Sequence, residues 1–168
     1  MGKIVSPKRK RAGSVLLALV VATASFSGYK LYEKNQPVGH HVPYYDTVAT
    51  VIAKRPTQVR WLEQRDPLCK DLLGFYYEDK VVLCRKAYIA LQRGDPMGIL
   101  TFTHELGHAR GHRAEYRAQC FALRNVKRVT RSLFKYLSPQ AVYEWSIAYH
   151  YLLNPEYQFD PLGKRHCP

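Results

Sequence analysis

Two histidines and a glutamate form a compact group near the middle of the chain, in a His-Glu-x-x-His pattern at residues 104–108. Histidines four residues apart lie on one face of an α-helix, about 6 Å apart along its axis, so both imidazoles can reach one zinc ion. Glu105 projects beside this pair, where a carboxylate can take a proton from a zinc-bound water. The pattern therefore predicts a hydrolytic zinc site, with His104 and His108 as ligands and Glu105 as the general base.

The residues around this motif favour a metal-binding helix that packs on a small sheet. Asp95 and Pro96 supply a cap and a first-turn proline, and Gly111 offers a place for the helix to end. Directly upstream, residues 74–84 have the composition of two strands joined by a tight turn at residues 78–80. We therefore expect an α+β domain that is mostly helical, with a short sheet or hairpin packed on the metal-binding helix.

Over roughly residues 74–120, the motif and its surroundings resemble the zincin metallopeptidases, zinc hydrolases built around His-Glu-x-x-His. The resemblance implies a minimal zincin-like domain that binds zinc and hydrolyses peptide bonds, in a protein or in the peptide stems of a cell wall. It also implies that the strand upstream of the motif borders the cleft. The free edge of that strand would pair with an extended peptide substrate.

A hydrolytic zinc site usually has a third protein ligand, and two candidates follow His108: His112 and Glu115. If the helix ran straight on, these residues would lie about 12 and 16 Å along the axis from His104. Neither residue could then share an ion with both histidines. The chain must therefore bend after His108, and Gly111 is the residue best suited to bend it. Residues one turn into the following helix would come nearest to the metal, which favours Glu115.

Glu115 also resembles the third ligand of the gluzincins, in which a downstream helix supplies a glutamate followed by a small residue. Here the small residue is Ala118, which would allow close helix packing, and the interval is shorter than in most gluzincins. The competing metzincin pattern shares the glycine at 111, but Ala114 stands at its final histidine position. We therefore expect Glu115 to be the third ligand and keep His112 as the alternative.

Peptide hydrolysis also needs a group that stabilises the oxyanion formed when water attacks the carbonyl. The zincin resemblance implies a Tyr, His or Arg from a neighbouring element. The sequence does not select among its four candidates, which are Tyr149, His150, Arg113 and Tyr116.

Four cysteines in a chain that begins like an exported protein favour disulfide bonds. Of the three possible pairings, we expect Cys69–Cys84 and Cys120–Cys167. The first bond would tie a loop to the strand before the motif, and the second would pin the C-terminal tail to the helix after it. The alternative is a set of buried free thiols in a cytosolic protein.

Residues 1–27 are predicted to be a signal peptide or signal anchor, because a basic stretch at 3–11 precedes an apolar segment at 12–26. Ala22-Thr23-Ala24 fits the small-x-small rule for signal peptidase, with cleavage after Ala24. The positive-inside rule then places the rest of the chain outside the cytoplasm, either secreted, periplasmic or anchored by this segment.

Residues 28–45 are predicted to be a linker, and residues 46–168 the zincin-like domain. His40-His41 lies in this linker, and we expect a solvated pair because adjacent histidines point in different directions. Beyond the motif helix, we predict helices over residues 46–53, 58–64, 88–92, 112–136 and 139–153, and a tail without regular structure.

The chain carries a formal charge of +13, and five of its basic groups lie in residues 1–12, which leaves +8 for the rest. A basic surface favours anionic partners such as lipid headgroups or cell-wall polymers, and we predict no specific nucleic acid. An alternative function is an exported or membrane-tethered protein that binds an anionic polymer or surface through the basic 112–136 helix, with at most a structural zinc. The basic side chains of this segment are predicted to scatter around the helix, which counts against that alternative.

Overall fold

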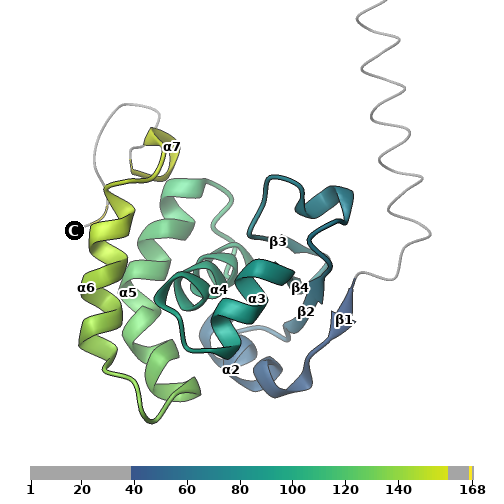
Figure 1. The fold of residues 1–168 in the computed structure, drawn as a ribbon, viewed down its shortest axis with the longest axis horizontal. Coiled ribbons are helices and arrows are strands. Elements are labelled where there is room, and N and C mark those ends of the chain that lie inside the picture. Colours follow the sequence, from purple (N-terminus) through teal and green to yellow (C-terminus); the bar gives the residue numbers. More distant parts are fainter. Residues whose placement is uncertain (1–38, 159–166, 168) are drawn as a thin grey trace, which may run out of the picture. The chain divides into compact units, whose positions relative to one another are not determined.

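Helices make up most of the fold, and a small β-sheet covers one side of it (Figure 1). The computed structural model describes residues 39–158 and Cys167. The predicted signal segment at 1–27 and most of the predicted linker lie outside these residues. Within the described ranges, no helix is long and apolar enough to cross a membrane. The expected α+β class, mostly helical, is confirmed.

The sheet has the strand order β1-β2-β4-β3. Its strands are β1 (His40–His41), β2 (Gln58–Leu62), β3 (Gly74–Tyr77) and β4 (Lys80–Cys84). Strand β2 pairs in parallel with β4, whereas β1 pairs with β2 and β3 pairs with β4 in antiparallel fashion. The predicted strand pair over residues 74–84 is confirmed. Glu78 and Asp79 both have positive φ at its turn, as expected for a two-residue hairpin.

Two predictions at the N-terminal side of the domain are wrong. Residues 58–62 form strand β2, not a helix, because they hydrogen-bond with β4, which lies 22 residues downstream. A five-residue segment is too short for helical and strand periodicity to be told apart. The predicted linker is also too long, because His40–His41 form strand β1 and a helix starts at Pro43. Asp46 does not cap this helix, since its side chain accepts hydrogen bonds from the backbone nitrogen of Val59 and from the ring of His41.

The helices agree with the sequence pattern in order but not at every boundary. The last turn, α7, corrects the prediction that the tail has no regular structure, and α5 is shorter than predicted at both ends. The helical elements are α2 (Pro43–Ala53), a 3₁₀ turn (Pro67–Cys69), α3 (Arg85–Gln92), α4 (Pro96–Ala109), α5 (Glu115–Leu133), α6 (Pro139–His150) and α7 (Pro155–Gln158).

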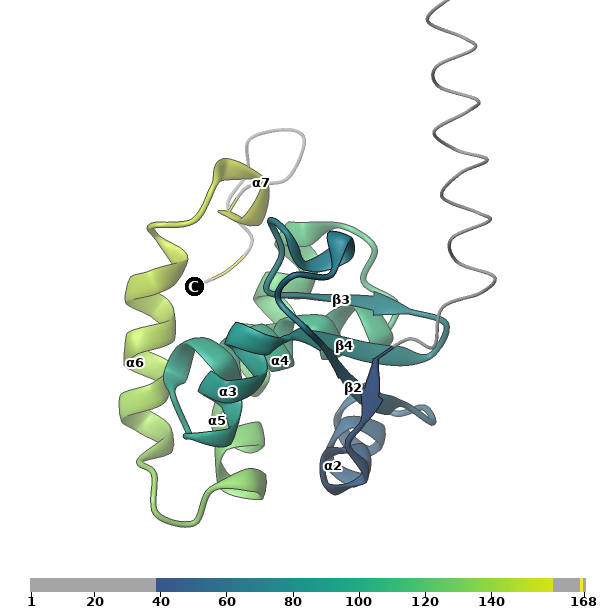
Figure 2. The ribbon, with the colours of Figure 1, turned by 45° about the vertical axis from the view of Figure 1, so that its right-hand side comes forward.

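Helix α4 lies at the centre of the fold, between the sheet and α5 (Figure 2). The side chain of Asp95 accepts a hydrogen bond from the backbone nitrogen of Met97 at 2.8 Å, which confirms the predicted cap. Phe102 and Leu106 are fully buried in the main hydrophobic core. Because α4 is held on several sides, the direction of its polar side chains is fixed by the packing of the whole domain.

Helices α4 and α5 approach each other closely at Gly107. A Cβ atom at this position would lie 2.9 Å from the Cα atom of Ala118, too close for any other residue. The predicted close packing at Ala118 is therefore confirmed, and Gly107 is its counterpart. This contact brings the first turn of α5 next to the histidines of α4.

Both predicted disulfide bonds are present, Cys69–Cys84 and Cys120–Cys167. The first joins the 3₁₀ turn to β4, and the second joins α5 to the end of the chain. Two disulfides and no free cysteine among the described residues indicate an oxidising, extracytoplasmic environment.

The basic residues of α5 lie on one side of the helix, which corrects the prediction that they scatter. The opposite side packs into the core through residues such as Ala122, Val126 and Val129. The segment appeared irregular in sequence because it included residues 112–114 and 134–136, which the structure places outside α5. The exposed arginines of α5 are Arg117, Arg124, Arg128 and Arg131.

Candidate metal centre

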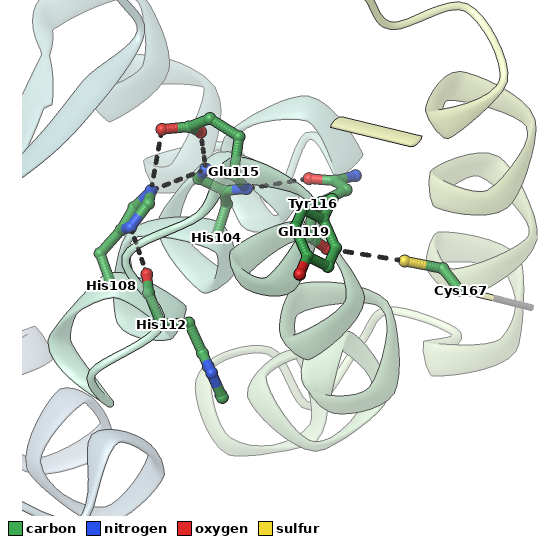
Figure 3. Close-up of polar contacts among 7 residues, drawn as sticks. All are labelled: His104, His108, His112, Glu115, Tyr116, Gln119 and Cys167. Carbon is green, nitrogen blue, oxygen red and sulfur yellow. Dashed lines mark hydrogen bonds and ion pairs between the residues drawn. The ribbon is translucent and has the colours of Figure 1, made fainter. Parts of the chain in front are cut away.

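His104, His108 and Glu115 bring three potential metal-binding atoms together at the junction of α4 and α5. Each offers one such atom, and all of these atoms lie within 4.8 Å of one another. The Nε2 atoms of the two histidines are 3.2 Å apart, and each faces the Glu115 carboxylate, at 3.0 Å from His104 and 3.5 Å from His108 (Figure 3). The structure thus places the three residues chosen from the sequence in one group.

The turn between the helices makes this arrangement possible. Helix α4 ends at Ala109, and Gly111 has a φ of +104°. Residues other than glycine rarely adopt this backbone angle. The chain then folds back, and Glu115 is the first residue of α5 rather than one turn into it. The predicted bend at Gly111 is therefore present.

His112 occupies a different position from the one expected of a third ligand. Its ring packs against Phe121, with 5.4 Å between ring centroids, and points away from the cluster (Figure 3). Its backbone oxygen instead accepts a hydrogen bond from Nδ1 of His108 at 2.7 Å. His112 thus contributes its main chain to the site.

The Nδ1 atoms of both histidines are held by oxygen acceptors. Nδ1 of His108 donates to the backbone oxygen of His112, and Nδ1 of His104 lies 3.0 Å from the side-chain oxygen of Gln119. A proton on each Nδ1 leaves the lone pair on each Nε2, directed at the centre of the cluster. Gln119 was not predicted as a site residue, although its position four residues after Glu115 places it on the same face of α5.

Charge is concentrated at this cluster. Without a metal, His104 and His108 can each carry a proton on Nε2 and donate it to Glu115, and these hydrogen bonds hold the pKa of the Glu115 carboxyl well below its usual range. Burial lowers the pKa of His108, but the hydrogen bond to Glu115 and the charges of Glu105 and Glu115 outweigh it and raise the pKa overall. Two imidazole lone pairs and a carboxylate that converge on one point repel one another unless a proton or a cation lies between them.

Glu105 lies beside the cluster as a buried carboxyl. Glu105 is only 5% exposed, and this burial raises the pKa of its carboxyl group. Its Oε2 atom has no hydrogen-bond partner within the described part of the chain. Gly74 of β3 makes room for it, because a Cβ at residue 74 would lie 3.2 Å from Cγ of Glu105 and 3.0 Å from the backbone oxygen of Val82.

The cluster and Glu105 line a cavity of about 850 Å³. Its sheet wall consists of residues 71–76, and its helical wall consists of Tyr149, residues 152–154 and Tyr157. The ring of Tyr157 lies 5.7 Å from that of His104, centroid to centroid. Burial, followed by the nearby charge of Glu115, raises the pKa of the Tyr157 hydroxyl, so this group keeps its proton at neutral pH.

The four candidate oxyanion residues do not all reach this cavity. Arg113 and Tyr149 line it, whereas Tyr116 and His150 do not. Tyr157 was missed in the sequence because it lies more than 40 residues after Glu115, in a segment with no helical pattern. Only the folded chain brings it next to His104.

Comparison of the chain with protein-family models, with curated proteins and with solved structures found no match. The geometry described above is therefore the basis for a functional proposal.

Proposed function

We propose that this chain is a zinc-dependent metallopeptidase of the zincin type, which acts on a protein or on cell-wall peptides outside the cytoplasm. The observation that carries the proposal is the convergence of the two Nε2 atoms and the Glu115 carboxylate beside the buried carboxyl of Glu105. A structural zinc site normally has four protein ligands, whereas three ligands that face a cavity leave a position open for chemistry.

The donor set fits zinc. Two neutral imidazoles and one carboxylate form a common ligand set for catalytic zinc, and the contacts from Gln119 and the His112 backbone orient the rings. When bound, the ion would supply Lewis acidity for the peptide carbonyl and acidify the attacking water.

The residues of this chain would carry the proton transfers. Glu105 is the general base, which takes a proton from the attacking water and passes it to the nitrogen of the leaving amine. Its raised pKa suits both steps, because burial strengthens the carboxylate as a base. Tyr157 would donate a hydrogen bond to the developing oxyanion, and Tyr149 and Arg113 are the further candidates within the cavity.

The cleft suits an extended peptide. Strand β3 is the last strand of the sheet, paired only with β4 among the described strands, and residues 74–76 line the cavity. A peptide that added to this edge would pass in front of Glu105. Leu72 on one side and Leu152 on the other are exposed by 46% and 81%, so apolar substrate side chains have surfaces to contact.

Metal analysis together with hydrolysis tests this proposal. The purified full chain should contain about one zinc per molecule and cleave an unfolded protein such as labelled casein. Glu105→Gln should keep the zinc and lose hydrolysis, because the amide cannot accept the proton. Glu115→Ala should lose most of the zinc.

His112→Ala is the matched control for the ligand assignment. It should keep its zinc, because only the main chain of His112 contacts the cluster. A chain that binds no zinc would refute the proposal, and a zinc-loaded chain in which Glu105→Gln leaves cleavage unchanged would refute the role of Glu105.

A further inference from the structure

Four arginines form a single row along the outer face of α5. Arg117, Arg124, Arg128 and Arg131 are all exposed, and they follow one another at intervals of seven, four and three residues. At 3.6 residues per turn, their directions fall within a sector of roughly 60°, and the row is about 21 Å long. We call these four residues the arginine row.

No acidic side chain of the described residues pairs with the arginine row. No Asp or Glu occurs between Glu115 and Glu144 in the sequence. Within the described residues, none of the four guanidinium groups takes part in an ion pair, whereas four other basic side chains, His41, Arg55, Lys80 and Arg85, form ion pairs with carboxylates. Arg117 contacts the ring and hydroxyl of Tyr116, which do not neutralise its charge. A row of cations without ion-pair partners attracts anions strongly and releases counterions when it binds them.

The row leads to the cleft. Arg113, which is also exposed, lines the cavity and precedes Arg117 by four residues. Arg113 lies in the turn just before α5, between the cavity and the first residue of the arginine row along the chain. A long anionic molecule lying along α5 would have one part near the mouth of the cleft.

The residues on this face of α5 favour a linear polyanion over a membrane as the binding partner. A helix that lies on a membrane inserts large apolar side chains between the lipids. The apolar side of α5 is buried in the core instead, and the large apolar residues that are exposed belong to other segments of the described chain. The disulfides place the chain where anionic surface polymers occur, outside the cytoplasm.

We propose that the arginine row binds a linear polyanion with closely spaced phosphate or carboxylate groups. This binding holds the chain on an anionic surface polymer, with the cleft at one end of the bound segment. It does not depend on the peptidase proposal, because none of the four arginines contacts the metal cluster.

The experiment measures binding of the full chain to two probes, inorganic polyphosphate and poly-D-glutamate, which no ordinary peptidase cleaves. Arg124→Glu, Arg128→Glu and Arg131→Glu are combined in one variant. We expect its affinity to fall at least about 30-fold. The slope of log affinity against log salt should become shallower by roughly two units, since about 0.7 counterions are released per contact with a flexible chain. The probe that binds more tightly identifies phosphate or carboxylate as the preferred group.

A matched control carries the same change in charge elsewhere. Arg65→Glu, Lys86→Glu and Arg93→Glu alter three exposed residues that do not line the cavity, and we expect less than a threefold loss. A milder variant, with glutamine at 124, 128 and 131, covers the case in which charge reversal disturbs folding, and it should lose affinity as well. Zinc content should be the same in all of these variants.

Three results would overturn the proposal. One is equal loss of affinity in the row variant and its control, which would mean that only net charge matters. Another is the absence of binding to both polymers near 0.1 M salt. The third is binding that depends on the row but occurs only with vesicles containing an anionic phospholipid, which would assign this face to a membrane. Loss of zinc or hydrolysis with intact polymer binding would refute only the peptidase proposal.

Discussion

The two walls of the cleft are built in different ways. The sheet wall, residues 71–76, includes β3, which pairs with β4, and Val81 to Cys84 of β4 are fully buried. The helical wall ends in α7, which has no buried residue. Each wall is near one disulfide, Cys69–Cys84 for the sheet wall and Cys120–Cys167 for the helical wall.

This difference indicates how each wall is held in place. The sheet wall is continuous with the core, so its position is set by the folding of the whole domain. The helical wall lies against α5, and the Cys120–Cys167 bond anchors the chain that follows it. We therefore expect changes in the sheet wall to act on the catalytic carboxyl directly, and changes in the helical wall to act through local undocking.

Removal of each disulfide should give the largest effects and test this comparison directly. Replacing Cys69 and Cys84 by alanine should lower the free energy of unfolding by about 3 kcal/mol, the chain-entropy value for a loop of about 15 residues. For Cys120 and Cys167, which are 47 positions apart in the sequence, the same relation gives about 4 kcal/mol. The loss should be smaller than this, and smaller than that for Cys69 and Cys84, because α7 has no buried residue and can detach without global unfolding. Denaturant unfolding of both variants measures the difference.

Peptidase activity should rank these two disulfide variants in the opposite order to stability. The Cys120/Cys167 variant should lose more peptidase activity per folded molecule, because Tyr157 is no longer held at the cavity. If the Cys69/Cys84 variant instead loses more activity and less stability, the comparison of the walls is wrong.

Gly74→Val should damage the sheet wall without unfolding the domain. The new side chain would contact Cγ of Glu105 and the backbone oxygen of Val82. Strand pairing holds the backbone of Val82, so the side chain of Glu105 is displaced instead. A displacement of Glu105 by about 1 Å should lower kcat/KM about 100-fold while zinc content is kept. Lys70→Ala, an exposed change next to the same wall that does not line the cavity, is the control and should have little effect.

Tyr157→Phe tests the helical wall at its contact with His104. We expect about a 10-fold loss of kcat/KM, less than the roughly 100-fold expected for a rigid oxyanion donor, because α7 is not buried. Tyr151→Phe is the matched control, since Tyr151 does not line the cavity. An unchanged rate in Tyr157→Phe, with a large loss in Tyr149→Phe, would assign the role to Tyr149.

The smallest predicted effect is on the stability of the zinc-free protein, through the cluster of His104, His108 and Glu115 that lies between the two walls. The pKa of Glu115 is lowered on folding, so its stabilisation is present above the unfolded value near 4.5 and is lost as the pH falls below it. The pKa of His108 is raised, so its stabilisation is complete below about 6.5 and is lost as the pH rises through the folded value. Zinc-free wild type should therefore exceed Glu115→Gln in stability most clearly between about pH 4.5 and 6.5, as measured by denaturant unfolding. A constant difference from pH 4 to 9 would contradict this.

The sequence predicted the parts of the fold that depend on local signals. The cap at Asp95, the hairpin at residues 78–80 and the bend at Gly111 each rest on one or two residues with strong backbone preferences. Strand β2 was not predictable in this way, because its pairing with β4 arises only in three dimensions.

The candidate site also contains both residues that local sequence signals predict and residues that only the folded chain brings together. His104, His108 and Glu115 lie within 12 residues, so helix geometry and one bend were enough to expect them together. Gly74 and Tyr157 reach the site from distant segments, and no spacing rule connects them to the motif. The contribution of Gln119 lay between these cases, since its helical position was visible but its acceptor role was not.

The short interval between His104 and Glu115 also bears on the order in which the chain folds. Loop-closure entropy rises with the logarithm of loop length, so contacts within the α4–α5 hairpin form at lower cost than the β2–β4 pairing, which must close a loop about twice as long. The ligand set would then form on a helical hairpin before the sheet wall is complete. Pulsed hydrogen exchange during refolding should show amide protection in α4 and α5 before β2 and β4, so that zinc has a binding surface while the cleft is still incomplete.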